Sequence, residues 1–191
     1  MFEQFRKEIC RHVDFKDKEL ELIENGLCLR KVPKKYKLVE EGKICREIYF
    51  VNKGLMRLLY DKEGDEITAF IFKENLFASS YSSFLEQSPS IQILESLEET
   101  ELIVLPYDYL MFLYENLPKM HILIRIVAEQ RFINSQKVLA SHLLKTPEER
   151  YWEFQLLHKD LLKRVPLHII ASYLGITPVS LSRIRNRTHK N

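Results

Sequence analysis

The chain has 191 residues, of which 46% are hydrophobic and 29% are charged. That length is enough for one large domain or two small domains with a buried core. Because the sequence contains no run of about 18 apolar residues and its first residues lack a signal-peptide pattern, we expect a cytoplasmic protein without a membrane partner.

Charge is distributed unevenly along the chain. Residues 159–191 contain seven Lys or Arg and one Asp, which is a net charge of +6. Since the whole chain has a net charge of +2, the other 158 residues have −4. A basic end on an acidic body is typical of a DNA-binding segment joined to a sensory domain, although such charge by itself provides only sequence-independent affinity for phosphates.

The first 27 residues indicate two helices, and the segment after them indicates strands. Apolar residues recur at helical spacing before Gly26, and Asp17 is placed to cap the second helix. From residue 28 to residue 105, short apolar runs alternate with turn residues, such as Glu41-Gly42, which indicates an all-β sandwich or barrel. The expected strands are 37–39, 48–51, 55–60, 67–72, 91–94 and 102–105.

The three cysteines, Cys10, Cys28 and Cys45, form no CxxC pair. Their odd number argues against a disulfide framework, so we expect plain thiols, two of them buried. An iron–sulfur cluster normally needs four thiolates and is therefore excluded.

Past Pro106, the spacing of apolar residues predicts helices over 107–117, 119–144 and 147–157. The apolar positions of 119–144 are too many and too widely spread for a helix that packs on one surface. Such a helix can pack on its own domain and against a second copy of itself, which we favour over a single buried core helix.

The helix 147–157 begins with a strong N-terminal signal. Thr146 is a good N-cap, and Glu148 and Glu149 place negative charge in the first turn, where it suits the helix dipole. We expect the core of a small C-terminal domain to include Trp152, Phe154, Leu156 and Leu157.

The most specific pattern of the chain lies in residues 171–187 and reads as two short helices joined by a tight turn. The first helix ends at Leu174, and Gly175 is able to adopt the positive φ at which a helix end turns back. Thr177 is a good N-cap, and Pro178 follows at the first helical position. This is the pattern of a helix-turn-helix, whose second helix enters the DNA major groove.

The second helix has two different faces. At about 100° per residue, Leu181 and Ile184 share an apolar side, and Arg185 lies near it, in reach of phosphate from the flank. The opposite side is basic, although an ordinary surface helix with solvated charges is the alternative. Its residues are Val179, Arg183, Asn186 and Lys190, flanked by Ser182 and Arg187.

These patterns together resemble the Crp/Fnr family of bacterial transcription regulators. The resemblance covers almost the whole chain and is carried most specifically by residues 170–178 and 181–185. Glu41-Gly42, residues 48–57 and the long predicted helix support it. The phrase Tyr-Leu-Gly-Ile-Thr-Pro with Leu-Ser-Arg-Ile-Arg is similar to the branch of the family common in Bacteroidetes.

The resemblance implies an α+β fold in three parts. Residues 1–117 would form a sensor domain, a cyclic-nucleotide-binding-like β roll (a double-stranded β helix), and residues 118–145 a long dimerisation helix. Residues 146–191 would form a small all-α helix-turn-helix domain, and because the sequence stops soon after its second helix we expect no C-terminal wing. The implied partners are double-stranded DNA with a two-fold symmetric operator, a second copy of the chain, and RNA polymerase.

The resemblance also implies roles for residues of the second helix. Arg183 aligns with the arginine that reads guanine, a contact that suits a bidentate guanidinium, and Ser180 aligns with a phosphate-contacting hydroxyl. The other two usual base readers align with Pro178 and Val179, which cannot form those hydrogen bonds, so we expect a different operator. The predicted DNA-binding residues are Thr177, Val179, Ser180, Ser182, Arg183, Arg185, Asn186, Arg187, Lys190 and, in the first helix, His168.

The segment that would bind an effector departs from the family pattern. Members that bind cyclic AMP carry a Gly-Glu pair for the ribose and an Arg-Ser pair for the phosphate, but segments 75–84 and 87–92 contain neither glycine nor arginine. Because a buried phosphate without Arg loses its main charge-assisted partner, we expect no cyclic AMP binding of the usual kind and no other cofactor. Five polar residues suit either a more neutral effector or a filled interior and surface loop: Ser79, Ser80, Ser82, Ser83 and Gln92.

Two other classes of function have less support in the sequence than DNA binding. A metal oxygenase on a β barrel needs His ligands inside the barrel, but no His occurs between Cys28 and Leu105, and nucleophile and phosphate-loop motifs are absent. We therefore expect no catalytic residues and no metal site. A ligand-sensing module that acts through protein partners is the remaining alternative, and the outward Arg183, Arg187 and Lys190 count against it.

Overall fold

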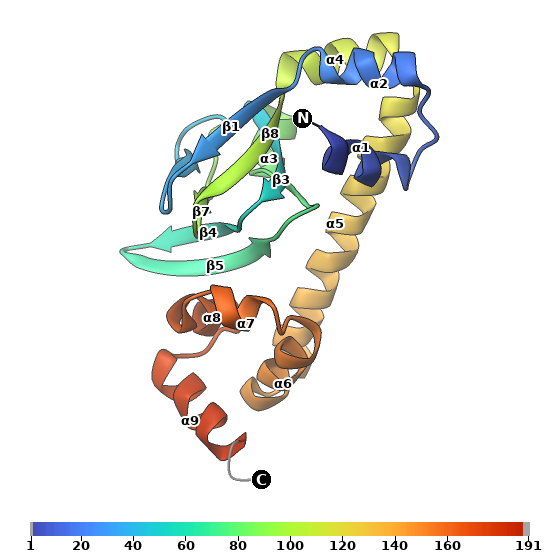
Figure 1. The fold of residues 1–191 in the computed structure, drawn as a ribbon. Helices are drawn as coiled ribbons and strands as arrows, with labels where there is room; N and C mark the ends of the chain where they lie inside the picture. Colours follow the sequence, from blue (N-terminus) through green and yellow to red (C-terminus); the bar gives the residue numbers. More distant parts are fainter. Residues whose placement is uncertain (1, 189–191) are drawn as a thin grey trace. The chain divides into compact units, whose positions relative to one another are not determined.

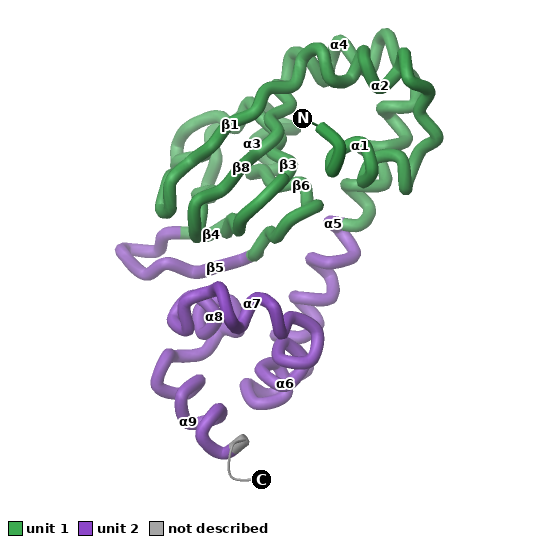
Figure 2. The backbone as a smooth tube through the Cα atoms, viewed as in Figure 1, with its two compact units in different colours: residues 1–60, 70–130 green, residues 61–69, 131–191 purple. Residues whose placement is uncertain are grey.

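The structure, a computed structural model, describes residues 2–188 (Figure 1). The chain divides into two compact units, with residues 1–60 and 70–130 in the first and residues 61–69 and 131–191 in the second (Figure 2). The first unit holds most of the β structure and the N-terminal helices. The second holds the C-terminal helices and the end of one hairpin.

Two four-stranded sheets form the body of the first unit (Figure 1). Their paired strands are antiparallel, and both sheets contribute to one hydrophobic core, for example through Val104 and Leu94. The sandwich or barrel predicted from the apolar runs is therefore confirmed. In pairing order, the first sheet holds β1 (Cys28–Val32), β8 (Thr100–Pro106), β3 (Glu47–Lys53) and β6 (Phe77–Ala78). The second holds β2 (Lys37–Val39), β7 (Ile93–Ser96), β4 (Met56–Lys62) and β5 (Asp65–Phe72).

Three elements of the first unit lie outside the expected set. Strand β1 escapes sequence reasoning because Arg30 and Lys31 interrupt its apolar residues and only Val32 is buried. Strand β6 has two residues, too few for a periodic pattern. Helix α3 (Tyr81–Glu86) is rich in Ser and aromatic residues, whose helix propensity is modest.

The N-terminal helix α1 (Glu3–Cys10) packs on the first sheet through an aromatic cluster. The ring of Phe5 meets Phe50 and Phe77 edge-on, with ring centroids 5.4 and 6.2 Å apart. Edge-to-face contacts of this kind are favoured because the positive ring edge meets the negative ring face. The helical start expected from the spacing of Phe5 and Ile9 is confirmed, and both are buried.

Helix α2 (Asp17–Glu24) begins at the residue that was expected to be its cap. Asp17 is the first helical residue, so its assignment as the cap is wrong, and Lys16 occupies the cap position. The Lys16 N–H donates to the Glu19 carboxylate at 2.7 Å. A carboxylate three residues into the helix therefore satisfies the N–H group of the cap, as in a capping box.

After α2 the chain passes close to α4 (Tyr107–Asn116) at Gly26. A Cβ added to Gly26 would lie 2.2 Å from Cδ1 of Tyr109. The Tyr109 hydroxyl donates to the carbonyl of Leu22. Any side chain at position 26 would displace this tyrosine, so glycine is required here by close approach.

The three thiols differ in burial. Cys45 is buried and both Cys10 and Cys28 are exposed, so the expectation of two buried cysteines is wrong. Cys10 ends α1 outside the face that buries Phe5 and Ile9, and Cys28 begins β1 where that strand is still exposed.

Helix α5 (Lys119–Leu144) is the long helix predicted from the sequence, and it contributes residues to both units. The prediction that Thr146 caps the next helix is also confirmed. The Thr146 hydroxyl accepts the Glu149 N–H at 3.3 Å, and the Thr146 N–H donates to the Glu149 carboxylate at 2.8 Å. The helices that follow are α6 (Pro147–Leu157), α7 (Leu161–Arg164), α8 (Leu167–Tyr173) and α9 (Pro178–Thr188).

The core of these C-terminal helices differs in part from the expectation. Phe154 is buried, but Trp152, Leu156 and Leu157 are exposed, Leu156 to 72%, so their assignment to the core is wrong. Trp152 and Leu156 lie off the face of α6 that carries the buried Tyr151 and Phe154, because residues one or two positions apart do not share a face of a helix. Leu157 is the last residue of α6. Other helices complete the core with Leu161, Val165, Ile169, Ile170, Leu174, Leu181 and Ile184.

The end of the β4–β5 hairpin belongs to the second unit (Figure 2). The Ser172 hydroxyl of α8 accepts the Thr68 N–H and donates to the Glu66 carbonyl, both at 2.8 Å. One side chain therefore satisfies two backbone groups of β5.

A buried ion pair crosses the second sheet. Arg57 of β4 and Glu95 of β7 stand opposite each other in strand register and are only 4% and 7% exposed. Arg57 donates to Oε1 of Glu95 from Nη2 at 2.9 Å and from Nε at 3.2 Å. Because desolvation of an ion is costly, each charge depends on the other for compensation.

We expect Glu95→Ala to lower the free energy of unfolding by about 3–5 kcal/mol, the range for a broken buried pair. The matched control is Glu101→Ala, which removes the carboxylate paired with the exposed Lys31. Its effect is expected to be much smaller because water screens exposed pairs. Urea unfolding measures both variants, and equal losses would contradict a special role for burial at Glu95.

Candidate functional site

The turn between α8 and α9 has the geometry predicted from the sequence. Gly175 has φ +63°. The Ile176 N–H donates to the Ala171 carbonyl and the Gly175 N–H to the Ser172 carbonyl, both at 3.0 Å. These two bonds form a Schellman motif, which satisfies carbonyls at the end of α8 and reverses the chain.

Helix α9 begins with the predicted cap. The Ser180 N–H donates to the Thr177 hydroxyl at 3.1 Å, and Pro178 stands at the first helical position. The Thr177 hydroxyl also donates to the Ser180 hydroxyl at 2.9 Å. These two predicted DNA-binding hydroxyls therefore serve the start of the helix and remain near its outer surface.

The two faces of α9 are those predicted by helical geometry. Leu181 and Ile184 are buried against the neighbouring helices α8 and α6. Arg185 is half-buried at the flank. The exposed residues of the helix include Val179, Ser182, Arg183, Asn186 and Arg187.

The predicted DNA-binding residues also include one in α8 and one outside the described residues. His168 is exposed at the second position of α8. Arg187 lies 3.9 Å from the Glu148 carboxylate, at a place where both side chains are largely exposed. Lys190 lies outside the described residues.

A residue that sequence reasoning missed, Arg150 of α6, supports the turn. Its Nε donates to the Leu174 carbonyl at 2.9 Å and its Nη1 to the Lys145 carbonyl at 2.8 Å. The guanidinium thus binds carbonyls at the C-terminal ends of α8 and α5, where the helix dipole favours a cation. Burial, followed by the charge of Arg150, lowers the pKa of the neighbouring His142. A single Arg has no periodic pattern that could have revealed this role.

Two of the proposed effector residues lie in one hydrogen-bonded cluster. The Ser90 hydroxyl donates to the Ser80 hydroxyl at 2.7 Å, and the Ser80 hydroxyl donates to Oε1 of Gln92 at 3.1 Å. The Gln92 amide donates to the Tyr60 hydroxyl at 2.7 Å. We call Tyr60, Ser80, Ser90 and Gln92 the polar cluster. Tyr60 and Ser90 were not singled out by the sequence.

The other three effector residues are placed differently. Ser79 is buried beside Ser80 in the chain. Ser83 is buried as well, but its hydroxyl accepts the Cys45 N–H at 2.9 Å and donates to the Ser88 carbonyl at 2.5 Å. Ser82 is exposed. The five residues therefore do not converge on one point.

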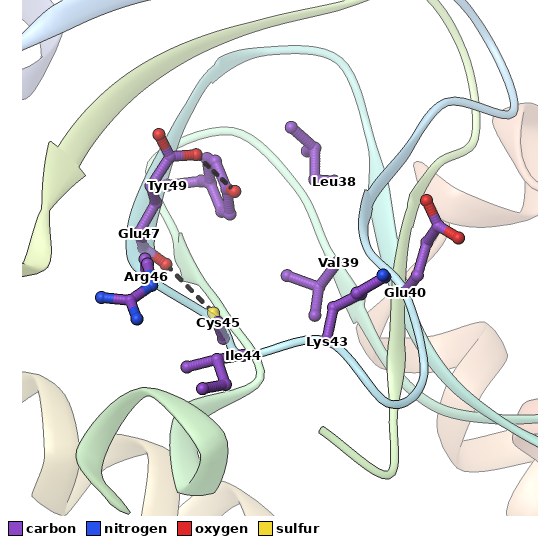
Figure 3. A pocket seen from close by; sticks show the side chains of 9 residues that line it. All are labelled: Leu38, Val39, Glu40, Lys43, Ile44, Cys45, Arg46, Glu47 and Tyr49. Carbon is purple, nitrogen blue, oxygen red and sulfur yellow. Dashed lines mark hydrogen bonds between the residues drawn. The ribbon is translucent and has the colours of Figure 1, made fainter. Parts of the chain in front are cut away.

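A separate cavity of about 210 Å³ lies between β2 and the start of β3 (Figure 3). It is lined by residues 38–40, residues 43–47 and Tyr49, none of which belongs to the polar cluster. The Cys45 thiol donates to the Glu47 carbonyl at 3.3 Å, and the Tyr49 hydroxyl donates to the Glu47 carboxylate at 2.7 Å (Figure 3).

Glu47 is ionised and fully engaged beside this cavity. Burial opposes its ionisation, but hydrogen bonds from Arg30 and Tyr49 outweigh burial and lower its pKa. Arg30 donates to both carboxylate oxygens, at 2.6 and 2.8 Å. Burial, followed by the bond to Glu47, raises the pKa of Tyr49. Arg30, Glu47 and Tyr49 satisfy one another's charges and hydrogen bonds, so we assign them a structural role.

Within residues 2–188, no group of three or more His, Cys, Asp or Glu side chains is arranged to hold a metal ion. In the same part of the chain, no helix is long and apolar enough to cross a membrane.

Residues 29–116 match the family described as the cyclic nucleotide-binding domain. This range begins in β1 and ends with α4. No curated protein matches the sequence significantly.

Solved structures extend the likeness to most of the chain. The c-di-GMP-responsive global regulator CLP from Xanthomonas campestris is similar with a TM-score of 0.74 and 16% identity, over 92% of each chain. FixK2 from Bradyrhizobium japonicum also has a TM-score of 0.74 and 16% identity, over 86% of this chain and 85% of that chain. A protein from Eubacterium rectale assigned to the Crp/Fnr family has a TM-score of 0.73 and 18% identity, over 92% of this chain and 84% of that chain.

Residues 29–116 therefore match a cyclic nucleotide-binding domain, and the chain has an α+β fold like that of solved Crp/Fnr regulators. The β domain is followed by α5 and the C-terminal helices in the order that the resemblance implied.

We expect Gly175→Ala to destabilise the turn, because left-handed backbone costs about 1–2 kcal/mol for a residue with a Cβ. The new Cβ would also lie 3.0 Å from Cε1 of His142, which would have to move. Gly42→Ala is the matched control, since Gly42 has φ +78° but no atom within 4 Å of its added Cβ. Thermal unfolding should show the larger loss for Gly175→Ala, and equal losses would contradict a role for the His142 contact.

Proposed function

We propose that the protein is a dimeric DNA-binding transcription regulator. The observation that carries this proposal is the division of α9 into two faces. Leu181 and Ile184 pack inward, while Arg183, Asn186 and Arg187 are exposed on the other side. An exposed basic face on the second helix after a tight turn suits insertion into the DNA major groove.

Within α9 we assign base reading to Arg183 and phosphate contacts to its neighbours. A guanidinium can donate two hydrogen bonds to the edge of one guanine. Ser182, Arg185 and Arg187 flank it and suit the phosphate backbone, which positions a protein without reading sequence. Val179 offers no hydrogen bond but can contact a thymine methyl group. The operator therefore differs from the usual one of the family.

The proposed second chain pairs through α5. Phe132 and Leu143 are 64% and 73% exposed, and Leu139 is exposed on the same side. A single chain would leave these large apolar side chains in water, which favours their burial against a partner. Two paired chains would offer two α9 helices to successive major grooves about 34 Å apart, as a two-fold symmetric operator requires.

For regulation we propose a small-molecule effector other than cyclic AMP. The polar cluster is the candidate contact, with Ser79, Ser82 and Ser83 as weaker candidates nearby in the chain. A ligand would have to exchange bonds with Ser80 and Gln92, which now bind each other. One structural relative is described as c-di-GMP-responsive, so a related fold serves a ligand other than cyclic AMP. RNA polymerase as a partner, a cytoplasmic location and the Bacteroidetes branch stay predictions.

A second candidate is a ligand-sensing module that acts through protein partners. It is favoured by the exposed apolar residues Trp152, Leu156 and Leu157 on α6. The two candidates differ in salt dependence, because DNA binding releases counterions and weakens steeply as salt rises. The test is a mobility shift on pooled promoter fragments at several salt concentrations, and absence of any salt-sensitive shift would overturn the DNA proposal.

We expect Arg183→Ala to weaken binding to the selected operator by about 1–3 kcal/mol and to relax specificity at one base pair. Arg187→Ala is the matched control from the same helix. Since we assign Arg187 to phosphate, its loss should weaken binding uniformly on all sequences and reduce the salt slope by about one. Operators selected from random DNA provide the measurement, and uniform weakening by Arg183→Ala would make Arg183 a phosphate contact instead.

We expect cyclic AMP to change neither the DNA affinity nor the melting temperature of the protein. The physical reason is that segments 75–84 and 87–92 offer no arginine to the phosphate. Differential scanning fluorimetry and the mobility shift, each with and without cyclic AMP, check this. A rise in melting temperature that saturates with cyclic AMP would show that another cation binds the phosphate.

A further inference from the structure

The inside of the cavity between β2 and the start of β3 is apolar (Figure 3). Its buried members are Val39, Cys45 and Tyr49, which offer aliphatic, thiol and aromatic surface. Val39 lies across the cavity from the other two residues (Figure 3). Leu38 and Ile44 extend the apolar wall. The interior therefore suits the apolar body of a small ligand.

The mouth of the cavity is charged. Glu40, Lys43 and Arg46 line it and are all exposed, so they lie at its outer edge. Within the described part of the chain, neither Lys43 nor Arg46 has a carboxylate within ion-pair distance. Two cations with unsatisfied charge face one carboxylate, and this balance favours an anionic group at the mouth.

The remaining charge of the lining, Glu47, does not oppose an anion. Arg30 donates to both oxygens of its carboxylate, and the Tyr49 hydroxyl donates to one of them. An entering anion would therefore meet a compensated carboxylate at Glu47 and unpaired cations at the mouth. The charge that it meets is positive on balance.

The walls of the cavity are fixed by backbone hydrogen bonds. The Gly42 N–H donates to the Ser90 carbonyl at 2.7 Å, and the Ser90 N–H donates to the Lys43 carbonyl at 2.9 Å. On the other wall, the pairing of β2 with β7 shifts register between Lys37 and Val39, an irregularity that redirects side chains. A ligand would therefore enter a preformed site and would not have to order the loop.

The volume of the cavity limits the size of the ligand. An apolar cavity of about 150 Å³ is known to bind benzene. The cavity of about 210 Å³ in this protein accordingly has room for one ring, or a branched chain of similar size, together with a short polar head.

We propose that this cavity is a binding site for a small carboxylic acid with a ring-sized or branched apolar body. The body lies among Val39, Cys45 and Tyr49, and the carboxylate accepts hydrogen bonds from Lys43 and Arg46 at the mouth. The site goes beyond the proposed function, because it shares no residue with the polar cluster, with α5 or with α9. It therefore stands or falls independently of DNA binding.

The test measures the affinity of the full chain for para-fluorophenylacetate by fluorine NMR. This probe combines a ring the size of benzene with a carboxylate, and para-fluorophenylacetamide has the same ring with a neutral head. We expect the acid to bind at least about tenfold more tightly than the amide, because hydrogen bonds to charged groups are stronger than those between neutral groups.

The first variant removes the charges at the mouth. Lys43→Ala combined with Arg46→Ala should weaken binding of the acid at least about tenfold and leave binding of the amide unchanged. The matched control is Lys34→Ala combined with Lys37→Ala, which removes two exposed cations from outside the lining. Its affinity for the acid should stay within about twofold of that of the wild-type chain, because salt screens distant exposed charges.

The second variant fills the cavity. Val39→Phe adds carbon atoms to the inner wall and should abolish binding of both probes, with circular dichroism as the check on folding. If Val39→Phe does not fold, the comparison of the two double variants decides the location of the site, because all four of their substitutions are at exposed positions.

Each contrary result overturns a defined part of the proposal. If neither probe binds the wild-type chain at millimolar concentrations, the site is overturned. Equal affinities for the acid and the amide would overturn the carboxylate head. If the acid binds but the mouth variant loses no more affinity than the control, binding takes place elsewhere and the location is overturned.

Discussion

The presentation of α9 depends on a few hydrogen bonds at the end of α8. The left-handed conformation of Gly175 directs the Gly175 and Ile176 N–H groups back to carbonyls of α8, and Arg150 binds the next free carbonyl at Leu174. The chain then reverses within three residues, so Leu181 and Ile184 return to the core formed by α8 and α6. Once those two side chains are buried, the periodicity of the helix fixes the direction of the Arg183 side chain, which lies on the exposed side.

The same division into a covered and an uncovered face governs α5. Apolar residues surround this helix, yet the chain covers only the side of Met120 and Leu123. Phe132 and Leu143 remain exposed, and the charged pair of Arg125 and Glu129 precedes them on the same helix. Uncovered apolar surface favours association without specifying geometry, whereas charges specify geometry at some expense of affinity.

Local signals predicted much of this fold, and nonlocal packing accounts for the misses. The cap at Thr146, the turn at Gly175 and the faces of α9 depend on a few adjacent residues, whose chemistry is visible in sequence. Strand β1 is held by pairing with β8, and Trp152 and Leu156 are exposed because their side of α6 receives no neighbour. Arg150 binds the Leu174 carbonyl and Tyr60 binds the Gln92 amide, partners that are 24 and 32 residues away in the chain. A periodic pattern in the sequence does not reveal such partners.

The sequence by itself therefore determined the succession of helices and strands, the tight turn between the last two helices and the outward position of Arg183, since each follows from spacing, propensity and turn chemistry within a few residues. Only the tertiary structure decided the interior of the β domain. It joined Ser80, Ser90, Gln92 and Tyr60 into one hydrogen-bonded cluster and placed Ser83 against the backbone of Cys45 and Ser88 instead. The physical reason is that a hydroxyl binds whichever polar group lies within hydrogen-bond distance. Strand pairing across the whole domain determines which groups those are.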